Sequence, residues 1–436
     1  MKLISPENPR TSTPLRFNTL DEWLTWQGKL HFTAIELGLE RCRKVAESMK
    51  LLPPAYFVIS IAGTNGKGSC AVMLENILRT AGYKVGIYTS PHLVRYNERI
   101  RINGEQVSDA DLCRSFNQID QARDNISLTY FEFGTLAAMD LFQARKIDVA
   151  IMEVGLGGRL DAVNMLDANV ALVSTIDIDH EQWLGHDRDS IGREKSGIFR
   201  PMRPAVCADP DPPSSLSETA NLVGANLVRS GHDFFHEVAD NAWSWRSGLI
   251  HYDRLPLPGN QVWQIQNASG VLMVIQAISD YFPVEQETIF NGFRDFNMPG
   301  RFQVIPGEVP LILDVAHNRQ SANTLAENLQ KLPAKGKNLV VLGMLKDKNH
   351  TAFITSLAPV VDKWYVTGLE EPRGAASSEL AGVINSINPD AVLFEFPAVS
   401  QALLAAQGDA VPGDRIIVTG SFVTVGDTMN QLDIGV

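Results

Sequence analysis

Cysteine is scarce in this sequence, and the few residues present form no pattern typical of a metal site or a disulfide framework. Cys42, Cys70, Cys113 and Cys207 lie far apart, and no Cys-x-x-Cys pair occurs. Structural zinc sites and disulfide-stabilised small domains use closely spaced cysteines, so neither is expected here. The four cysteines are therefore predicted to be buried free thiols.

The sequence also lacks long apolar runs and an excess of positive charge. The first ten residues contain Pro6 and Pro9 and no apolar stretch, so they resemble neither a signal peptide nor an anchor. No later run approaches the length that crosses a bilayer. The formal net charge of −12 argues against a nucleic-acid surface, which needs clustered lysine and arginine. We expect a cytoplasmic protein without membrane or nucleic-acid partners, whose anionic substrates bind a local positive pocket.

Strand and helix signals alternate along the first part of the chain. Helices are expected over 20–30, 35–49 and 131–145, and buried strands over 56–62, 84–88, 148–154 and 169–175. Such alternation predicts a mainly parallel sheet covered on both faces. The stretch 99–107 alternates around Asn103-Gly104, which predicts a β-hairpin with a type I′ turn, expected as a surface excursion.

A second unit is expected after Asn297-Met298-Pro299-Gly300. A new series of strands follows this turn, at 311–315, 338–342, 364–367, 392–395 and 415–419. With 436 residues and roughly 100 to 200 residues per domain, two domains are expected. The predicted fold class is α/β, with a doubly wound phosphate-loop domain over 1–297 and a smaller Rossmann-like domain over 298–436.

The segment from Gly63 to Ser69, Gly-Thr-Asn-Gly-Lys-Gly-Ser, follows a predicted strand and opens a predicted helix. Backbone N–H groups of such a turn wrap phosphate oxygens, and Lys67 reaches the terminal phosphates. The strict pattern would have Gly at position 61 and Ser or Thr at 68, where this chain has Ile61 and Gly68. The alternative is a glycine-rich turn that binds nothing, but the strand, loop, lysine and helix in register favour a shortened phosphate loop.

Three polar residues at the ends of predicted strands are candidate ligands for Mg²⁺, which neutralises charge in phosphoryl transfer. These are Ser90, Glu153 and His180. Singly, each is more simply a turn residue, a helix cap or a surface histidine. Because the carboxyl ends of parallel strands converge on one crevice, the three together favour a metal site beside the phosphate loop.

Three further segments leave their alternatives open. Lys195 could meet phosphate or metal, or it could form an ordinary pair with Glu194. Asp314 and His317 follow a strand of the second unit, where Asn318 is a candidate helix cap. The aromatic run at 130–133 could stack on a flat heterocycle, although aromatic residues at such a position more often belong to a core.

Taken in order, these motifs resemble the bacterial bifunctional dihydrofolate synthase/folylpolyglutamate synthase family, which is related to the Mur peptide ligases. The similar stretches are HFTAIELGLER, AGTNGKGS, YTSPHLVRYNERI, TYFEFGTL, EVGLGGRLDAVN, DHEQWLG, GREKSGIF, MPGRFQV, LDVAHN, GMLKDK and GSFVTV, between about Leu30 and Val425. One departure is Arg319-Gln320, because a Pro and a His commonly follow the Asn in the family.

The resemblance implies a set of sites, each a prediction at this point. ATP would be bound by Thr64, Asn65, Gly66, Lys67, Gly68, Ser69, Asn267, Arg301 and Asp314. Mg²⁺ would be held by Ser90, Glu153 and His180, and carbamylation of Lys195 would support a second ion. The dihydropteroate pocket would comprise Ala34, Ile35, Glu36, Leu37, Thr129, Tyr130, Phe131, Glu132, Leu160, Asp161 and Ala162. Lys195, His317 and Ser421 would act in catalysis or around glutamate.

The implied reaction joins the amine of L-glutamate to a folate-type carboxylate. Phosphoryl transfer from ATP would first convert the carboxylate into an acyl phosphate, which makes phosphate the leaving group. The expected partners are small molecules, namely ATP, L-glutamate and dihydropteroate or a reduced folate, and we expect a monomer. The alternatives are a folylpolyglutamate synthase with that activity alone, a Mur-type cell-wall ligase, and a phosphate-loop switch protein.

Overall fold

A computed structural model describes residues 15–33, 35–332 and 335–435. Its largest sheet has eight strands in the order β4-β3-β2-β5-β1-β6-β7-β8, and all pairs are parallel except those of β3 with β2 and β4. The strands are β1 (Phe57–Ala62), β2 (Val85–Tyr88), β3 (Ile100–Ile102), β4 (Glu105–Gln106), β5 (Val149–Glu153), β6 (Val170–Val173), β7 (Pro204–Cys207) and β8 (Asn226–Arg229).

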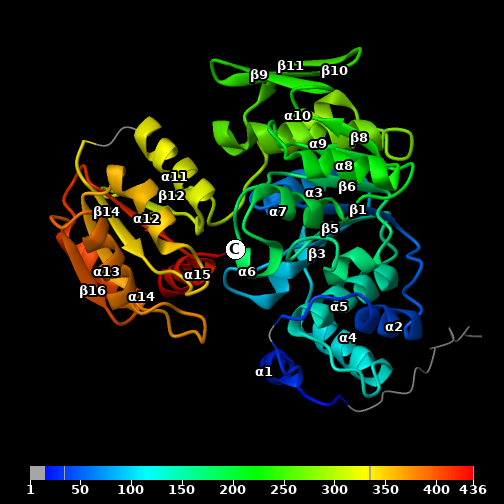
Figure 1. Ribbon diagram of the computed structural model, residues 1–436, viewed down its shortest axis with the longest axis horizontal. Coiled ribbons are helices and arrows are strands. Elements are labelled where there is room, and N and C mark those ends of the chain that lie inside the picture. The colour runs from blue at the N-terminus through cyan, green and yellow to red at the C-terminus, as the bar shows by residue number, and fades with distance from the viewer. Residues whose placement is uncertain (1–14, 34, 333–334, 436) are drawn as a thin grey trace, which may run out of the picture.

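Helices cover both faces of this sheet, so its central strands are buried on both sides (Figure 1). On β1, Val58 and Ala62 face one core, and Ile59 and Ile61 face the other. The first core is closed by α1 (Leu20–Leu30), α2 (Glu40–Ser48), α4 (Asp109–Ala122), α5 (Tyr130–Arg145), α7 (Arg188–Ser196) and α8 (Ser214–Val223). The second is closed by α3 (Lys67–Thr80), α9 (Ile265–Ala277) and α10 (Gln286–Arg294), and the short α6 is Glu181–Leu184.

Two predictions in this part of the chain were wrong in detail. The hairpin around Asn103-Gly104 has the predicted positive φ angles, 56° and 85°. It is not a surface excursion, since β3 pairs with β2 and extends the main sheet. The helix expected from Ile35 starts only at Glu40, because Gly38 has a φ of 151°, which a helix does not allow.

Sequence reasoning missed a three-stranded antiparallel sheet, β9 (Phe234–Ala239), β10 (Ala242–Ser247) and β11 (Ile250–Pro256), in the order β11-β10-β9. Trp243 and Trp245 alternate with more exposed residues on β10 and are buried against the core that includes α9. This period of two, with aromatic residues on one face, is the signal that would have predicted the sheet.

The last part of the chain forms a second parallel sheet in the order β12-β13-β17-β14-β15-β16, with only β12 antiparallel among the described strands. The strands are β12 (Gln303–Ile305), β13 (Leu311–Leu313), β14 (Asn338–Leu342), β15 (Lys363–Thr367), β16 (Leu393–Phe396) and β17 (Arg415–Thr419). The helices are α11 (Arg319–Lys331), α12 (His350–Leu357), α13 (Ser377–Ile387), α14 (Val399–Asp409) and α15 (Phe422–Gln431). The expected second series of strands is therefore present, and residues 298–436 remain our proposal for the second domain.

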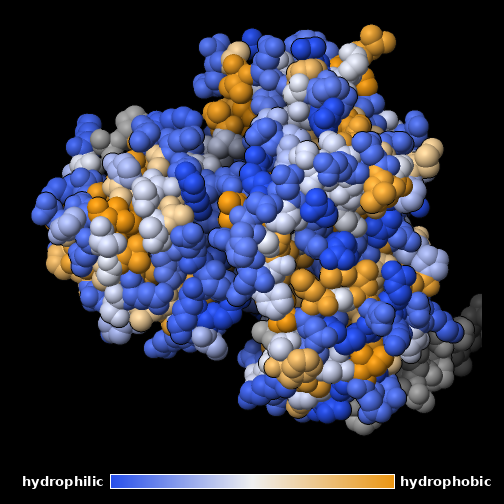
Figure 2. Space-filling view, viewed as in Figure 1, coloured by the Kyte–Doolittle hydropathy of each residue, from blue (hydrophilic) through white to orange (hydrophobic). Residues whose placement is uncertain are grey.

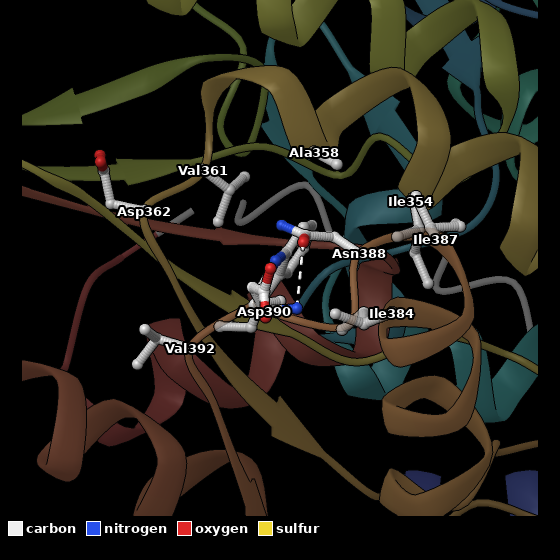
Figure 3. A pocket seen from close by; sticks show the side chains of 11 residues that line it. Ile354, Ala358, Val361, Asp362, Ile384, Ile387, Asn388, Asp390 and Val392 are labelled. Atoms are coloured by element: carbon white, nitrogen blue, oxygen red, sulfur yellow. Dashed lines mark hydrogen bonds between the residues drawn. The ribbon is translucent and has the colours of Figure 1, made fainter.

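A cavity of about 100 Å³ lies in this second unit, between α12, α13 and the start of β15 (Figure 3). Asp362 and Val392 on its wall precede β15 and β16, so it lies at the amino ends of these strands. The candidate site described below lies at the carboxyl ends of both parallel sheets, and the cavity is therefore separate from it.

The surface view shows apolar side chains in small groups among hydrophilic ones (Figure 2). Within the part of the chain that the structure describes, no helix is both long and apolar enough to span a membrane. All four cysteines are buried and unpaired, as predicted.

Candidate active site

The phosphate loop connects β1 to α3, as predicted. Gly66 has a φ of 86°, a left-handed conformation that favours glycine, and α3 begins at the next residue. The Lys67 ammonium donates hydrogen bonds to the carbonyl oxygens of Gly63, at 3.0 Å, and Thr64, at 3.2 Å. Burial lowers the pKa of Lys67. Together, the first backbone N–H groups of α3 and the Lys67 ammonium form a site suited to bind an anion.

Asn65, which is predicted to contact ATP, forms side-chain hydrogen bonds to the second unit. Its Nδ2 donates to Asn318 Oδ1, at 3.1 Å, and to Gln320 Oε1, at 2.6 Å, both in the second unit. Its backbone N–H donates to Thr175 Oγ1, at 3.2 Å. The Asn65 side chain therefore joins the phosphate loop to α11.

The remaining loop residues face α9 and the segment that connects the two units. A Cβ atom on Gly66 would collide with Asn267 Oδ1. Asn267, which is also predicted to contact ATP, therefore lies directly against the loop. A Cβ atom on Gly68 would come within 2.8 Å of the Met298 side chain, and Ser69 Oγ lies 3.6 Å from Met298 Sδ. Asn267 and Met298 thus close one side of the phosphate loop.

Ser90 and Glu153 meet because β2 and β5 are parallel neighbours. The Ser90 N–H donates to Glu153 Oε2 at 3.2 Å. Glu153 is only 4% exposed. Burial raises the pKa of Glu153, and the Lys67 ammonium opposes this rise. Among the described residues this is the one hydrogen bond found for the carboxylate, so a buried negative charge is left largely unpaired.

His180, the third predicted metal ligand, lies beside Asp179 and Lys348. Its Nε2 lies 3.4 Å from Lys348 Nζ and 4.0 Å from Asp179 Oδ2. Burial, together with the Lys348 ammonium, lowers the pKa of His180 to about 3, so its imidazole is neutral. Within the described residues no group of three or more His, Cys, Asp or Glu side chains has metal-binding geometry.

Lys195 is buried beside the phosphate loop. Its Nζ donates to the Gly63 carbonyl oxygen at 2.9 Å, and Lys67 donates to the same oxygen. Burial and the nearby Lys67 ammonium lower the pKa of Lys195 to about 7. The alternative of an exposed pair with Glu194 is therefore wrong, since Glu194 binds Arg159 instead.

In the second unit, Arg301 and Asp314 lie near each other, and His317 approaches Asp179 of the first unit. Asp314 accepts hydrogen bonds from the N–H groups of Phe302 and Ala316, each at 2.8 Å, and the Arg301 guanidinium lies 4.9 Å from the Phe422 ring centroid. His317 Nε2 lies 3.6 Å from Asp179 Oδ2.

Ser421 and Asn318 both cap helices of the second unit. Ser421 Oγ accepts from the Thr424 N–H at 3.0 Å, at the start of α15, so this hydroxyl is engaged in capping. Asn318 Oδ1 accepts from the Ser321 N–H at 3.0 Å, at the start of α11, which confirms its expected cap.

The residues expected to bind pteroate come together from three segments. Arg41 binds both Glu36 and Glu132, which links the loop 35–37 to the start of α5. The Gly38 N–H donates to the Leu160 carbonyl at 3.0 Å, which brings in 160–162. Phe131 packs against Gly155. Thr129 caps α5, Tyr130 and Ile35 to Leu37 are half-buried, Ala162 is buried, and Ala34 lies outside the described residues.

Asp161 is buried in this group and caps a short 3₁₀ helix. Its carboxylate accepts from the N–H groups of Leu156, at 2.8 Å, and Val163, at 3.0 Å. Burial raises the pKa of Asp161 to about 7 despite these hydrogen bonds.

Comparison with known proteins agrees with this geometry. The family model of the Mur ligase middle domain matches residues 61–236, and that of the Mur ligase glutamate ligase domain matches residues 300–422. A dihydrofolate synthase/folylpolyglutamate synthase of Escherichia coli K12 is 43% identical over 421 residues, 97% of this chain and 97% of that protein. The chain belongs to the dihydrofolate synthase/folylpolyglutamate synthase family. It is therefore an ATP-dependent ligase of the Mur ligase superfamily.

Solved structures of this family share the whole fold. E. coli FolC in complex with DHPP and ADP has a TM-score of 0.92 at 43% identity, over 97% of this chain and 99% of that one. A bifunctional folylpolyglutamate synthase/dihydrofolate synthase with Mn, AMPPNP and L-glutamate bound has a TM-score of 0.89 at 44% identity, over 97% and 100%. A Mycobacterium tuberculosis folylpolyglutamate synthase has a TM-score of 0.82 at 27% identity, over 91% and 96%. The predicted α/β class is confirmed.

Sequence reasoning on this family member missed four polar residues at the site. Lys348 lies in the stretch GMLKDK, which was matched without a role, and Asp179 directly precedes the proposed ligand His180. Gln320 was noted only as a departure from the family pattern. Arg99 lies in the matched stretch YTSPHLVRYNERI, which assigns it no role, and its place beside two tyrosine rings reveals it.

Proposed function

We propose that the chain adds L-glutamate both to dihydropteroate and to reduced folates, by way of an acyl phosphate. The observation that carries the proposal is that the phosphate loop and the nearby Asp179 of the first unit meet polar side chains of the second. Asn65 binds Asn318, and Asp179 binds Lys348. Relatives solved with ADP, with DHPP and with L-glutamate support the same assignment of substrates.

ATP would place its phosphates at the start of α3, between Lys67 and Arg301. The loop from Thr64 to Ser69 would surround them, with Asn267, Arg301 and Asp314 contacting the nucleotide from the other side. This proposal is supported by Asn267 lying against Gly66. It is also supported by Arg301, whose positive charge lies close enough to Glu153 of the first unit to oppose the rise that burial causes in the pKa of this carboxylate.

The buried carboxylate of Glu153 fits a divalent cation, because it has a single hydrogen bond to offset its charge. Ser90 and His180 would complete the protein ligands, with phosphate oxygens and water supplying the rest. The cation would neutralise charge on the transferring phosphoryl group. A relative with Mn and AMPPNP bound supports a divalent cation beside the nucleotide.

Lys195 would bear a carbamate and so hold a second cation. Carbon dioxide reacts with a neutral amine, and a pKa lowered to about 7 leaves about half of the Lys195 side chains neutral at pH 7. The product is a carboxylate in place of an ammonium, which removes the repulsion between Lys195 and Lys67. We therefore propose that this lysine is carbamylated in the active enzyme.

Arg99 would hold the carboxylate of the acceptor substrate. Its guanidinium lies over the rings of Tyr96, at 5.3 Å, and Tyr130, at 5.6 Å, and its Nε donates to His92 Nδ1 at 2.8 Å. Arg99 is 9% exposed, and none of the described carboxylates forms an ion pair with it. A buried, unpaired guanidinium beside the proposed pteroate residue Tyr130 is suited to an anionic ligand.

The reaction would then proceed in two steps. An acceptor carboxylate oxygen attacks the γ-phosphorus of ATP, and ADP leaves. The glutamate amine attacks the carbonyl carbon of the acyl phosphate, loses a proton, and phosphate leaves with the original carboxylate oxygen. Lys67 and Arg301 offset the charge on the phosphoryl group, and contact between the two units keeps water away from the acyl phosphate.

Oxygen transfer tests this chemistry. With acceptor labelled by ¹⁸O in its carboxylate, mass spectrometry of the released phosphate should find one ¹⁸O atom per turnover. Unlabelled phosphate from a productive reaction would contradict the acyl phosphate. The bifunctional relatives share 43–44% identity with this chain, against 27% for the M. tuberculosis folylpolyglutamate synthase, and this favours both activities over the second alone.

A further inference from the structure

The first turn of α11 holds the phosphate loop of the other unit through side-chain amides. Asn65 and Asn318 form a reciprocal pair, in which each Nδ2 donates to the other Oδ1 at 3.1 Å. Gln320 Oε1 accepts the second Asn65 Nδ2 hydrogen at 2.6 Å and lies 3.4 Å from Thr175 Oγ1. One glutamine thus contacts two segments of the first unit.

These contacts leave Asn65 with every polar atom bonded. Its backbone N–H donates to Thr175 Oγ1, and its carbonyl oxygen accepts from Ser174 Oγ at 2.6 Å. Both amide hydrogens and the amide oxygen are engaged by the second unit. Because Asn65 lies within the phosphate loop, the position of α11 and the conformation of this loop are fixed together.

We propose that Gln320 is a positioning residue that couples the phosphate loop to the second unit through Asn65. In this role Gln320 takes no part in the reaction itself. It acts by favouring the arrangement in which the two units meet. The family pattern commonly has histidine at this position, so the contact uses a residue that departs from that pattern. An amide has no titrating group at neutral pH, and the coupling therefore needs no defined protonation state.

The proposal rests on the proposed function for its kinetic readout only. We would compare Gln320→Ala with Gln330→Ala, a matched control at an exposed position of the same helix. Alanine favours helix, so both variants retain α11. Gln320→Ala should raise the KM for L-glutamate by about three- to tenfold, the effect of one hydrogen bond, and Gln330→Ala should match the unaltered enzyme.

Two further measurements separate this coupling from a general loss of activity. If Gln320 acts through Asn65, the double variant with Asn65→Ala should lose no more activity than Asn65→Ala alone, and additive losses would overturn the proposal. Small-angle X-ray scattering with a non-hydrolysable ATP analogue and Mg²⁺ needs no turnover. Gln320→Ala should give a larger radius of gyration than Gln330→Ala, and equal radii together with equal KM values would overturn the coupling.

Discussion

Lys348 Nζ donates to Asp179 Oδ1 at 2.7 Å, an ion pair that joins the two units beside the phosphate loop. Both side chains are largely buried, with 6% and 9% exposed. Burial alone would raise the pKa of Asp179, but the neighbouring His317 imidazole, 3.6 Å away, and the Lys348 ammonium hold this pKa well below its ordinary value. Asp179 therefore stays ionised and depends on its partners in the second unit.

Replacing Lys348 should disrupt this junction strongly. Lys348→Met leaves the buried Asp179 carboxylate without its cation, and removing one partner of a buried pair costs about 3–5 kcal/mol. We expect kcat/KM to fall by about 100-fold or more. Lys346→Met, at an exposed position of the same segment, is the control and should keep its activity. Equal activities of the two variants would show that the ion pair is dispensable.

Carbamylation of Lys195 has a direct spectroscopic test. With ¹³C-labelled bicarbonate, the unaltered protein should show a carbamate ¹³C NMR signal that is absent from Lys195→Ala and retained in Lys44→Ala, a variant at an exposed lysine. Activity lost in Lys195→Ala should return in part when acetate supplies a carboxylate. A full-strength carbamate signal in Lys195→Ala would place the modification elsewhere.

The same lysine predicts a pH dependence. The lowered pKa of about 7 means that Lys195 is protonated below this pH and neutral above it. Only the neutral amine reacts with carbon dioxide, so the rate of carbamate formation at constant dissolved carbon dioxide should rise with pH and level off above about 7. For an exposed lysine this rate would level off only above about pH 10.4. The pH dependence of the rate distinguishes the two, and a midpoint near the exposed value would contradict the buried environment.

Gly66 should tolerate no side chain. At a φ of 86°, alanine costs about 1–2 kcal/mol in backbone energy, and its Cβ would also displace Asn267. Gly66→Ala should raise the KM for ATP by about tenfold or more. Gly382→Ala is the control, because this helical glycine has open space around it and alanine there should leave ATP binding unchanged.

Arg99→Met should weaken binding of the acceptor. Loss of a charge-assisted hydrogen bond costs about 1.5–3 kcal/mol, so the KM for dihydropteroate should rise by about tenfold or more. Arg95→Met, at an exposed arginine of the same segment, should have little effect. If the KM for L-glutamate rose instead, Arg99 would hold the amino acid and not the acceptor.

The main sheets and the phosphate loop could be predicted from sequence because their signals are local. The strand Phe57–Ala62, the glycines and Lys67 adjoin one another, and the strands that apolar runs predicted lie within one or two residues of their observed bounds. The strands β7, β8 and β12 of the same sheets were not predicted. Helix α2 was started too early because apolar spacing alone does not show that Gly38 breaks the helix.

The junction between the units could not be predicted in this way. Asn65 and Gln320 are 255 positions apart in sequence, and Asp179 and Lys348 are 169 apart. Their contacts depend on how two sheets face each other, which no local pattern encodes. Likewise, the lowered pKa of Lys195 arises from burial beside Lys67, which the stretch Gly192–Gly197 does not reveal.

The most direct test of the proposed function is ADP release by the purified enzyme with ATP and Mg²⁺, comparing two acceptors in the presence of L-glutamate. Turnover that requires glutamate with both dihydropteroate and tetrahydrofolate is the predicted result. Turnover with tetrahydrofolate alone would contradict the first activity, and turnover with neither acceptor would contradict the proposed function.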